Sequence, residues 1–497
     1  MSQMQKELSE HVTNGDEAAY AQKLGNFSKG LPHNELGEVN PDAYGAFVHA
    51  CATGAPADFE AIPMGCPAAN RLKLTNPQSG LAFDLEGMDS HATFIPPAPS
   101  FSSAEQACEI LENYWMALAR DIPFSEYDTH PLTHAAAQDL SRISDFRGPK
   151  IGNRVTTGTL FRGLTPGDLT GPYISQFFLL AAPYGANYIE QRIRTAVPNE
   201  DFMTDFSEWL SVQRGFPPAA QNHFDAERRY IRKGRDIASW VHLDVLYQAY
   251  FHAMLILLQP PSSDPLRSGI GAPFDAGNPY TSSATQMGFG SFGGPHIAAL
   301  MPEAATRALH AVWFQKWFVH RRLRPEVHAG RIHNFLTHAA PHYPLGRSDL
   351  LQSSVLDRLY SKSGTYLLPM AFPEGSPAHP SYGAGHATVA GASVTLLKAW
   401  FDESYIIPNA VQPAPDGLSL EPYTGAPLTV GGELNKLASN VALGRNIAGV
   451  HWRSDATESL KLGELIAINI LKDQKSTYNE DFGGFTLTKF DGTTITV

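Results

Sequence analysis

The chain of 497 residues has a hydrophobic content of 43%, so it is long enough to bury one large core or two smaller ones. Its formal net charge of −12 argues against a nucleic-acid or acidic-membrane partner, because phosphate groups are bound mainly through an excess of Lys and Arg. The sequence has no run of about 18 apolar residues that would predict a membrane span, and its first residues lack the apolar segment of an export signal. These features favour a soluble protein, cytoplasmic by default.

The three cysteines, Cys51, Cys66 and Cys108, all lie in the first quarter of the chain. An odd number excludes complete pairing within one chain. The sequence contains no C-x-x-C motif, which argues against a metal site. We expect buried free thiols, and the alternative is a single bridge within the chain or between two subunits.

The N-terminal segment, residues 1–101, is expected to wrap irregularly around the rest of the chain. Residues 52–101 in particular are rich in Pro, Gly and small polar residues. Ser102 and Glu105 then have the spacing of a capping box, which predicts the start of a helix over 104–120.

Further helices are predicted from apolar residues that recur at helical intervals. The ranges are 174–185, 237–258, 302–323, 386–401, 433–447 and 457–473. Alternating residues around Asp491-Gly492 predict a β-hairpin over 484–497. No fixed-period repeat is present, which argues against a solenoid. We expect a mainly α fold in one domain over 1–497, with long loops and a small C-terminal hairpin.

The first group of candidate site residues is KWFVHRRLRPE, residues 316–326. A residue before proline is pushed out of the α region, so Arg324 before Pro325 is expected to leave the helix and turn back toward Lys316. The alternative is a basic helix end that complements the helix dipole. Within this stretch, we expect three residues, His320, Arg321 and Arg322, to form such a basic helix end.

The second group is HPSYGAGHATVAGA, residues 379–392. Gly383 and Gly385 allow backbone to approach a ligand closely, and a helix starting near Ala387 presents unpaired N–H groups to an anion. His386 at this helix mouth suits a proton donor or acceptor coupled to a bound oxyanion. Alone, a histidine at a helix start is more often a surface residue.

The third group is GRNIAGVHWRSD, residues 444–455. Arg445 and His451 would point about 240° apart on one continuous helix, but a helix end at Gly449 lets both face one site. Asp455 is placed to hold the second ring nitrogen of His451.

Together the three groups supply two arginines, a lysine, a glycine-rich helix mouth and two histidines. Guanidinium groups and backbone N–H groups are the donors that a tetrahedral oxyanion accepts from. One histidine would bond the central atom and the other would handle protons.

The three motifs K316-x7-R324-P325, H379-P-S-Y-G-A-G-H386 and R445-x5-H451-x3-D455, in this order, closely resemble the vanadium-dependent haloperoxidases, and the algal-type bromoperoxidases most closely. That family shares its oxyanion pocket with bacterial acid phosphatases and lipid phosphatases. The motifs lie in a helical region that covers roughly residues 300–470.

The resemblance implies an all-α fold of two four-helix bundles and a vanadate cofactor. It implies His451 as the vanadium ligand, His386 as the acid/base and Lys316 as a second catalytic residue that polarises bound peroxide. The groups that it implies for the vanadate oxygens are Lys316, Arg324, Arg445 and the Gly385 amide. It also implies hydrogen peroxide, bromide or another halide and small organic acceptors as reactants, and a homo-oligomer built from dimers.

Three further positions concern the surroundings of the site. Trp313 matches an aromatic residue near the halide site, although a core Trp on an amphipathic helix explains it equally well. His379 lies where the bromoperoxidases are similar to this chain. Ala384 departs from the family pattern, which has a serine there, so one hydroxyl donor to vanadate is expected to be absent.

Two other functions remain open from the sequence. A phosphatase could use the same pocket, with His451 as nucleophile and His386 as the acid for the leaving group. A non-catalytic oxyanion-binding oligomer is the other alternative, supported by Ala384. Asp244 and Asp275 are candidates to pair with the pocket arginines, but the sequence does not place them.

Overall fold

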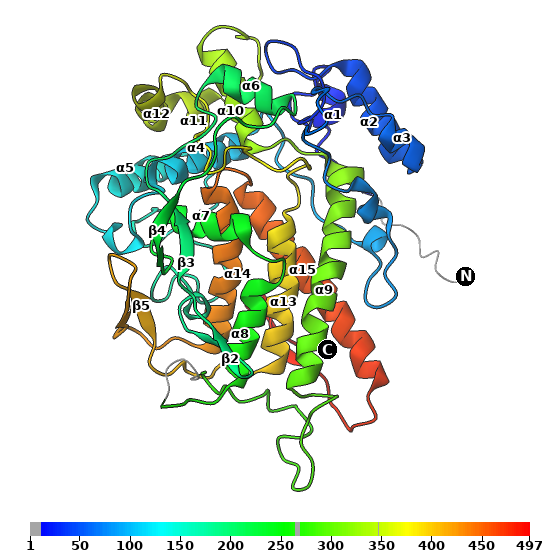
Figure 1. Ribbon diagram of the computed structural model, residues 1–497, viewed down its shortest axis with the longest axis vertical. Coiled ribbons are helices and arrows are strands. Elements are labelled where there is room, and N and C mark those ends of the chain that lie inside the picture. The colour runs from blue at the N-terminus through cyan, green and yellow to red at the C-terminus, as the bar shows by residue number, and fades with distance from the viewer. Residues whose placement is uncertain (1–10, 264–268, 346) are drawn as a thin grey trace.

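The computed structural model describes residues 11–263, 269–345 and 347–497 (Figure 1). The helices in chain order are α1 (Asp16–Ala19), α2 (Pro41–Thr53), α3 (Pro56–Glu60), α4 (Ala104–Ala119), α5 (Pro131–Leu140), α6 (Phe206–Gln213), α7 (Gly234–Leu243), α8 (Gln248–Leu258), α9 (Gly294–Phe314), α10 (Pro325–Leu336), α11 (Arg347–Gln352), α12 (Val355–Ser363), α13 (Gly385–Trp400), α14 (Val430–Ile447) and α15 (Arg453–Thr477). The short 3-10 helices are η1 (Pro77–Leu81), η2 (Ser90–Ala92), η3 (Phe124–Glu126) and η4 (Gln176–Phe178), and η5 (Gln315–His320) is a π-helix.

The strands in the described residues form antiparallel two-stranded pairs. They are β1 (Ala182–Tyr184) with β2 (Asn187–Ile189), β3 (Ile193–Ala196) with β4 (Phe224–Arg229), β5 (Val411–Pro413) with β6 (Leu420–Pro422), and β7 (Thr486–Thr488) with β8 (Thr494–Thr496). The last pair is the predicted hairpin, with Thr486 opposite Thr496. The expected mainly α fold with a small C-terminal hairpin is confirmed.

The helix α13 is the centre of the bundle that carries the site. It packs against α9, α14 and α15, and Figure 1 shows α8, α9, α13 and α14 side by side. Every residue of α13 except His386 is buried. Small residues make this possible, because a Cβ at Gly391 would collide with the Leu460 carbonyl of α15, and one at Gly463 with the Thr388 carbonyl of α13.

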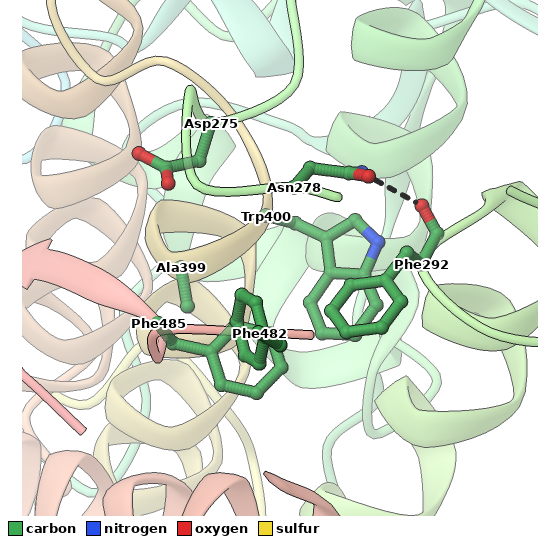
Figure 2. Close-up of a pocket in the computed structure, with 7 residues that line it drawn as sticks. All are labelled: Asp275, Asn278, Phe292, Ala399, Trp400, Phe482 and Phe485. Carbon is green, nitrogen blue, oxygen red and sulfur yellow. Dashed lines mark hydrogen bonds between the residues drawn. The ribbon is translucent and has the colours of Figure 1, made fainter. Parts of the chain in front are cut away.

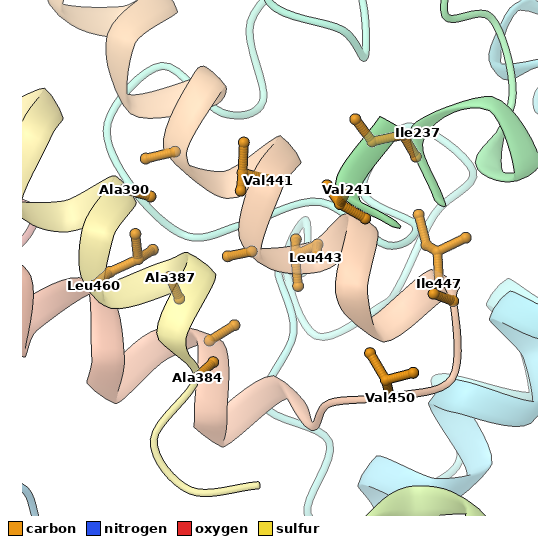
Figure 3. Close-up of a cluster of buried hydrophobic side chains, with 14 of the residues drawn as sticks. Ile237, Val241, Ala384, Ala387, Ala390, Val441, Leu443, Ile447, Val450 and Leu460 are labelled. Carbon is orange, nitrogen blue, oxygen red and sulfur yellow. The ribbon is translucent and has the colours of Figure 1, made fainter. Parts of the chain in front are cut away.

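An apolar floor joins the start of α13 to its neighbours. Figure 3 shows Ala384, which precedes α13, and Ala387 of α13 close to α15. Val441 and Ile447 lie on α14 and Val241 on α7. All of these side chains are buried. Each Å² of apolar surface removed from water stabilises a fold by roughly 25 cal/mol. Packing of these side chains therefore holds the helix ends that carry the site in fixed relative positions.

Four helix predictions are confirmed nearly as made: 104–120, 386–401, 433–447 and 457–473 correspond to α4, α13, α14 and α15. The capping detail of α4 is wrong by one residue. Ser103, rather than Ser102, is the N-cap, and its hydroxyl accepts from the Gln106 N–H. The prediction over 302–323 corresponds to most of α9 and to η5.

Two predictions need correction. The segment 174–185 is not a helix but η4 followed by β1, because Pro183 cannot donate the backbone hydrogen bond of a helix interior. The segment 237–258 is two helices, α7 and α8, at an angle of 100° to each other. Asp244 ends α7 in an extended conformation (φ −66°, ψ 150°), and the apolar spacing on either side conceals the break.

The N-terminal segment is less irregular than expected. The 13-residue helix α2 lies within 1–101, and its N-cap Asn40 accepts from the Ala43 N–H. Residues 1–10 of this prediction lie outside the described residues. In the described part of the chain no single helix is long and apolar enough to cross a membrane; only the bent pair of α7 and α8 reaches that length and composition together. Cys51, Cys66 and Cys108 are free thiols.

Candidate oxyanion-binding site

The ends of several helices meet around a cavity of about 480 Å³. His386 is the second residue of α13, Arg445 lies in the last turn of α14, and His451 follows that helix. These three side chains line the cavity together with Trp313, His379, Gly385 and Asp244. The second and third sequence groups therefore share one site, and His379 brings the first group to it.

Lys316 and Arg324 meet at His379, as the position of Pro325 led us to expect. Helix α9 continues into η5, which ends at Arg321 in the left-handed region (φ 42°). Arg324 is the extended N-cap of α10. The Lys316 Nζ and the Arg324 Nη2 each lie 2.8 Å from the His379 Nδ1. Nδ1 also lies 3.2 Å from the Pro380 carbonyl oxygen, and burial holds the pKa of this ring well below its usual range.

Three cations of the site are buried without a carboxylate partner. Among the described residues, none of Lys316, Arg324 and Arg445 forms an ion pair with Asp or Glu. Burial, followed by the charges of Arg324 and Arg445, holds the pKa of Lys316 well below its usual value. Burial also lowers the pKa of Arg324 to about 9 and of Arg445 to about 10. Such a cluster is stabilised by an anion, since uncompensated buried charges are strongly unfavourable.

The His451 ring is held with one nitrogen toward the cations. Gly449 (φ 90°) turns the chain after α14, as predicted. Nδ1 of His451 lies 2.8 Å from the Asp455 Oδ2, so Nδ1 carries the proton and donates. The Arg324 Nη1 lies 3.0 Å from Nε2, which therefore presents its lone pair. Burial, then Arg324 and Lys316, keep the pKa of His451 well below its usual range, so the ring is neutral.

Arg322 is a site residue that the sequence analysis missed. Interpreting it as a helix-end cation is wrong, because Arg322 is buried and its Nη1 and Nη2 lie 2.8 Å from Asp455 Oδ1 and Glu109 Oε2. Arg321 fits that interpretation in part: it donates to the carbonyls of Trp317 and Phe318, and it also pairs with Glu17 at 2.7 Å. Nothing local in the sequence signals Arg322, because both of its carboxylates lie more than 100 residues away.

His320 also departs from the helix-end interpretation. The ring is buried and packs edge-on against Tyr382, with ring centroids 4.9 Å apart. Burial lowers its pKa to about 3, so it carries no charge to complement a dipole.

His386 and Asp244 form the second histidine-carboxylate pair of the cavity. The His386 Nε2 lies 3.0 Å from the Asp244 Oδ1, in the break between α7 and α8. Asp244 therefore pairs with a pocket histidine rather than with a pocket arginine. Asp275 is in a separate small cavity with Asn278 and Trp400, so it does not pair with the site arginines (Figure 2).

Trp313 and His379 form one wall of the cavity. Their ring centroids are 4.9 Å apart, and the Lys316 Nζ lies 4.6 Å from the Trp313 ring. The Trp313 indole N–H donates to the Thr75 carbonyl at 3.1 Å. Trp313 is thus a half-buried wall residue rather than only a core residue.

Ala384 is the N-cap of α13, and its side chain is buried. Its backbone N–H donates to the Ser459 Oγ of α15 at 2.8 Å. The N-cap position thus has a hydroxyl partner for its backbone but offers no hydroxyl of its own toward Gly385 and His386.

The buried cations at the helix ends and the lone pair of the His451 Nε2 form a site suited to an oxyanion. The chain is therefore a helical-bundle protein of the class that binds oxyanions. The family model "VCPO second helical-bundle domain" matches residues 296–480. The vanadium-dependent bromoperoxidase of Corallina pilulifera is 40% identical to this chain, and the match covers 95% of this chain and 91% of that protein. The vanadium-dependent bromoperoxidase of Ascophyllum nodosum is 37% identical, and the match covers 92% of this chain and 83% of that protein. The homohexameric structure of the second vanadate-dependent bromoperoxidase from Ascophyllum nodosum matches with a TM-score of 0.90 at 32% identity, covering 98% of this chain and 86% of that chain. This chain belongs to the vanadium-dependent bromoperoxidases.

Proposed function

We propose that this chain oxidises bromide with hydrogen peroxide, using vanadate as its cofactor. Bromide loses two electrons and the O–O bond of the peroxide is broken; with the uptake of one proton, hypobromous acid and water are formed. The hypobromous acid then halogenates small organic acceptors. The proposal is carried by three buried basic side chains at one site, without carboxylate partners among the described residues; one of them, Arg324, contacts the Nε2 of a neutral histidine, in a chain of this family.

The residues of the site fit vanadate. The Arg445 Nε is buried and has no hydrogen-bond partner among the described residues, so it is available to an oxygen of the anion. The described residues contain no group of three or more His, Cys, Asp or Glu side chains that could hold a bare metal ion. The donor set therefore suits a metal that arrives as an oxyanion, held through its oxygens and one histidine.

We assign the holding roles on this basis. His451 would bond the vanadium through Nε2, and the oxygens would accept from the cations Lys316, Arg324 and Arg445 and from the Gly385 amide. That amide lies in the first turn of α13, where N–H groups lack a partner within the helix. When bound, vanadate supplies a Lewis-acid centre that activates hydrogen peroxide toward attack by halide.

His386 is placed to move protons in this reaction. Its Nε2 is engaged with Asp244, which leaves Nδ1 to exchange a proton inside the cavity. Lys316 and the arginines beside it are fixed before the reaction begins, at the place where negative charge develops. Trp313 and His379 form the wall that we assign to the halide.

We also propose that the chain forms a homo-oligomer built from dimers. The homohexamer reported for the related Ascophyllum nodosum enzyme supports this proposal.

Parallel assays of bromide oxidation and phosphate-ester hydrolysis test the proposed activity against the phosphatase alternative. We expect the vanadate-loaded protein to brominate a phenolic dye and to hydrolyse p-nitrophenyl phosphate weakly at most. Ester hydrolysis that persists unimpaired under saturating vanadate would favour the phosphatase. Tight vanadate binding without halide oxidation at any pH would favour the non-catalytic binding protein.

A further inference from the structure

The loop that leads into α9 is uncharged and projects from the molecule. Residues 276–302 contain no Asp, Glu, Lys or Arg in a chain with a net charge of −12. Figure 1 shows the green segment that leads into α9 extending beyond the end of that helix. We call residues 279–291 the 279–291 loop.

The base of the 279–291 loop is held in place. Figure 2 shows the Asn278 side chain donating to the Phe292 carbonyl, at 3.0 Å. Tyr280 donates to the Glu480 Oε1 at 2.6 Å, and Ser291 donates to the same oxygen. The Phe292 ring is buried in an aromatic cluster with Trp400, Tyr478, Phe482 and Phe485. The base of the loop is therefore fixed to the segment that follows α15 and, through Trp400, to α13.

The tip of the 279–291 loop exposes two large apolar side chains. Met287 is 79% exposed and Phe289 is 65% exposed. They contribute little to the core, so the fold does not account for apolar residues at this position. Adjacent exposed apolar side chains on a held loop are typical of an interaction surface.

We infer that the 279–291 loop is a contact between copies of this chain, with Met287 and Phe289 packing against a second copy. The inference rests on the homo-oligomer proposed above. Two copies that each carry −12 repel one another, so an uncharged projection is where they can approach with least repulsion. The loop has no basic residue to attract an anionic lipid surface, and no acidic residue to select a basic protein. A second copy is thus the partner that its chemistry fits.

The test is the mass of the assembly after the tip is made polar. We compare the full-length wild type with M287S/F289S by size-exclusion chromatography and light scattering over a dilution series. I151S is the matched control, because Ile151 is 64% exposed and lies in a different part of the sequence. On dilution, we expect the M287S/F289S oligomer to dissociate at a protein concentration at least tenfold higher than the concentration at which the wild-type and I151S oligomers dissociate. Circular dichroism verifies that each variant is folded.

Several outcomes would overturn the inference. Unchanged mass and dilution behaviour in folded M287S/F289S is one, and binding to neutral phosphatidylcholine vesicles that depends on Phe289, with unchanged mass, is another. A wild type that is monomeric throughout would overturn both this contact and the proposed oligomer. Bromination is measured on the same samples, so failure of the proposed activity is seen independently of the mass.

Discussion

Arg322 and Asp455 form a buried ion pair directly behind the cavity, with the Arg322 Nη1 2.8 Å from the Asp455 Oδ1. The other oxygen of Asp455 accepts from the Ser381 hydroxyl and from the His451 ring, each at 2.8 Å. Asp455 is thus held by three side chains from separate segments. The pair fixes which nitrogen of His451 carries the proton, and so which one faces the cations.

Substitution D455N should weaken vanadate binding while leaving a folded protein. An amide accepts less strongly than a carboxylate from the His451 Nδ1–H, so the ring is held less firmly in the required tautomer. Loss of such a supporting carboxylate typically lowers affinity about 10- to 100-fold. The measurement is the vanadate dissociation constant, determined by titration and by vanadium content after dialysis. S381A removes one hydrogen bond to the same oxygen but leaves the carboxylate in place, so it should have a smaller effect. Equal affinity in D455N and the wild type would contradict the assigned orientation of His451.

Substitution A384S should strengthen vanadate binding and stabilise α13. A serine at this extended N-cap (φ −86°, ψ 122°) can accept an N–H of the first turn, which is worth about 1 kcal/mol of stability. Its hydroxyl can also donate to the oxyanion, and a neutral hydrogen bond of about 0.5–1.5 kcal/mol corresponds to roughly a two- to tenfold lower dissociation constant. Titration with vanadate and thermal unfolding measure the two effects. A384G adds no hydroxyl and should not bind more tightly; a matching gain in A384G would assign the effect to backbone instead.

Lys29 should be essential for the segment that leads to His379. Its buried ammonium pairs with Glu326 at 2.8 Å and donates to the carbonyls of Glu374 and Ser376. K29M leaves Glu326 buried without its cation, which should lower the free energy of unfolding by about 3–5 kcal/mol. Chemical denaturation measures this change. K362M removes a half-exposed cation from Asp201 and should cost at most about 1 kcal/mol. A similar decrease in the free energy of unfolding in K29M and K362M would show that the buried Lys29 ion pair stabilises the fold no more than an exposed one.

His328 should contribute to acid destabilisation. Burial lowers its pKa to about 3, whereas an unfolded histidine titrates near 6.5. Between these values the unfolded chain binds a proton that the folded chain does not, so stability falls as the pH is lowered through this window. Replacing His328 by Gln should remove this site of proton binding from the unfolded chain. Between pH 7.5 and 5.0 the free energy of unfolding should then fall by about 2 kcal/mol less than in the wild type. Urea denaturation at both pH values measures the difference. An equal fall in the free energy of unfolding in the wild type and the variant would refute this role of His328.

The parts of the site that depend on local backbone rules could be predicted from sequence. Pro325 indicates where Arg324 leaves its helix, and Gly449 indicates where α14 ends before His451. The glycine-rich stretch indicates the helix mouth at His386. These are steric properties of single residues, and their neighbours do not alter them.

The supporting contacts could not be predicted in this way. Asp244 pairs with His386 only because α7 and α8 diverge at a break that the apolar periodicity conceals. Arg322 reaches Glu109, and Lys29 reaches Glu326, across hundreds of residues. Ionic partners at such separation are chosen by tertiary packing, which leaves no spacing pattern in the sequence.

We expect the cationic pocket to act through vanadate. The most direct measurement is bromination of a phenolic dye by the metal-stripped protein with hydrogen peroxide and bromide, before and after addition of orthovanadate. We predict that activity appears only after orthovanadate is added, and that phosphate present during reconstitution suppresses it by occupying the same donors. Full activity in the stripped protein, or no bromination despite stoichiometric bound vanadate, would show that the pocket does not act through vanadate.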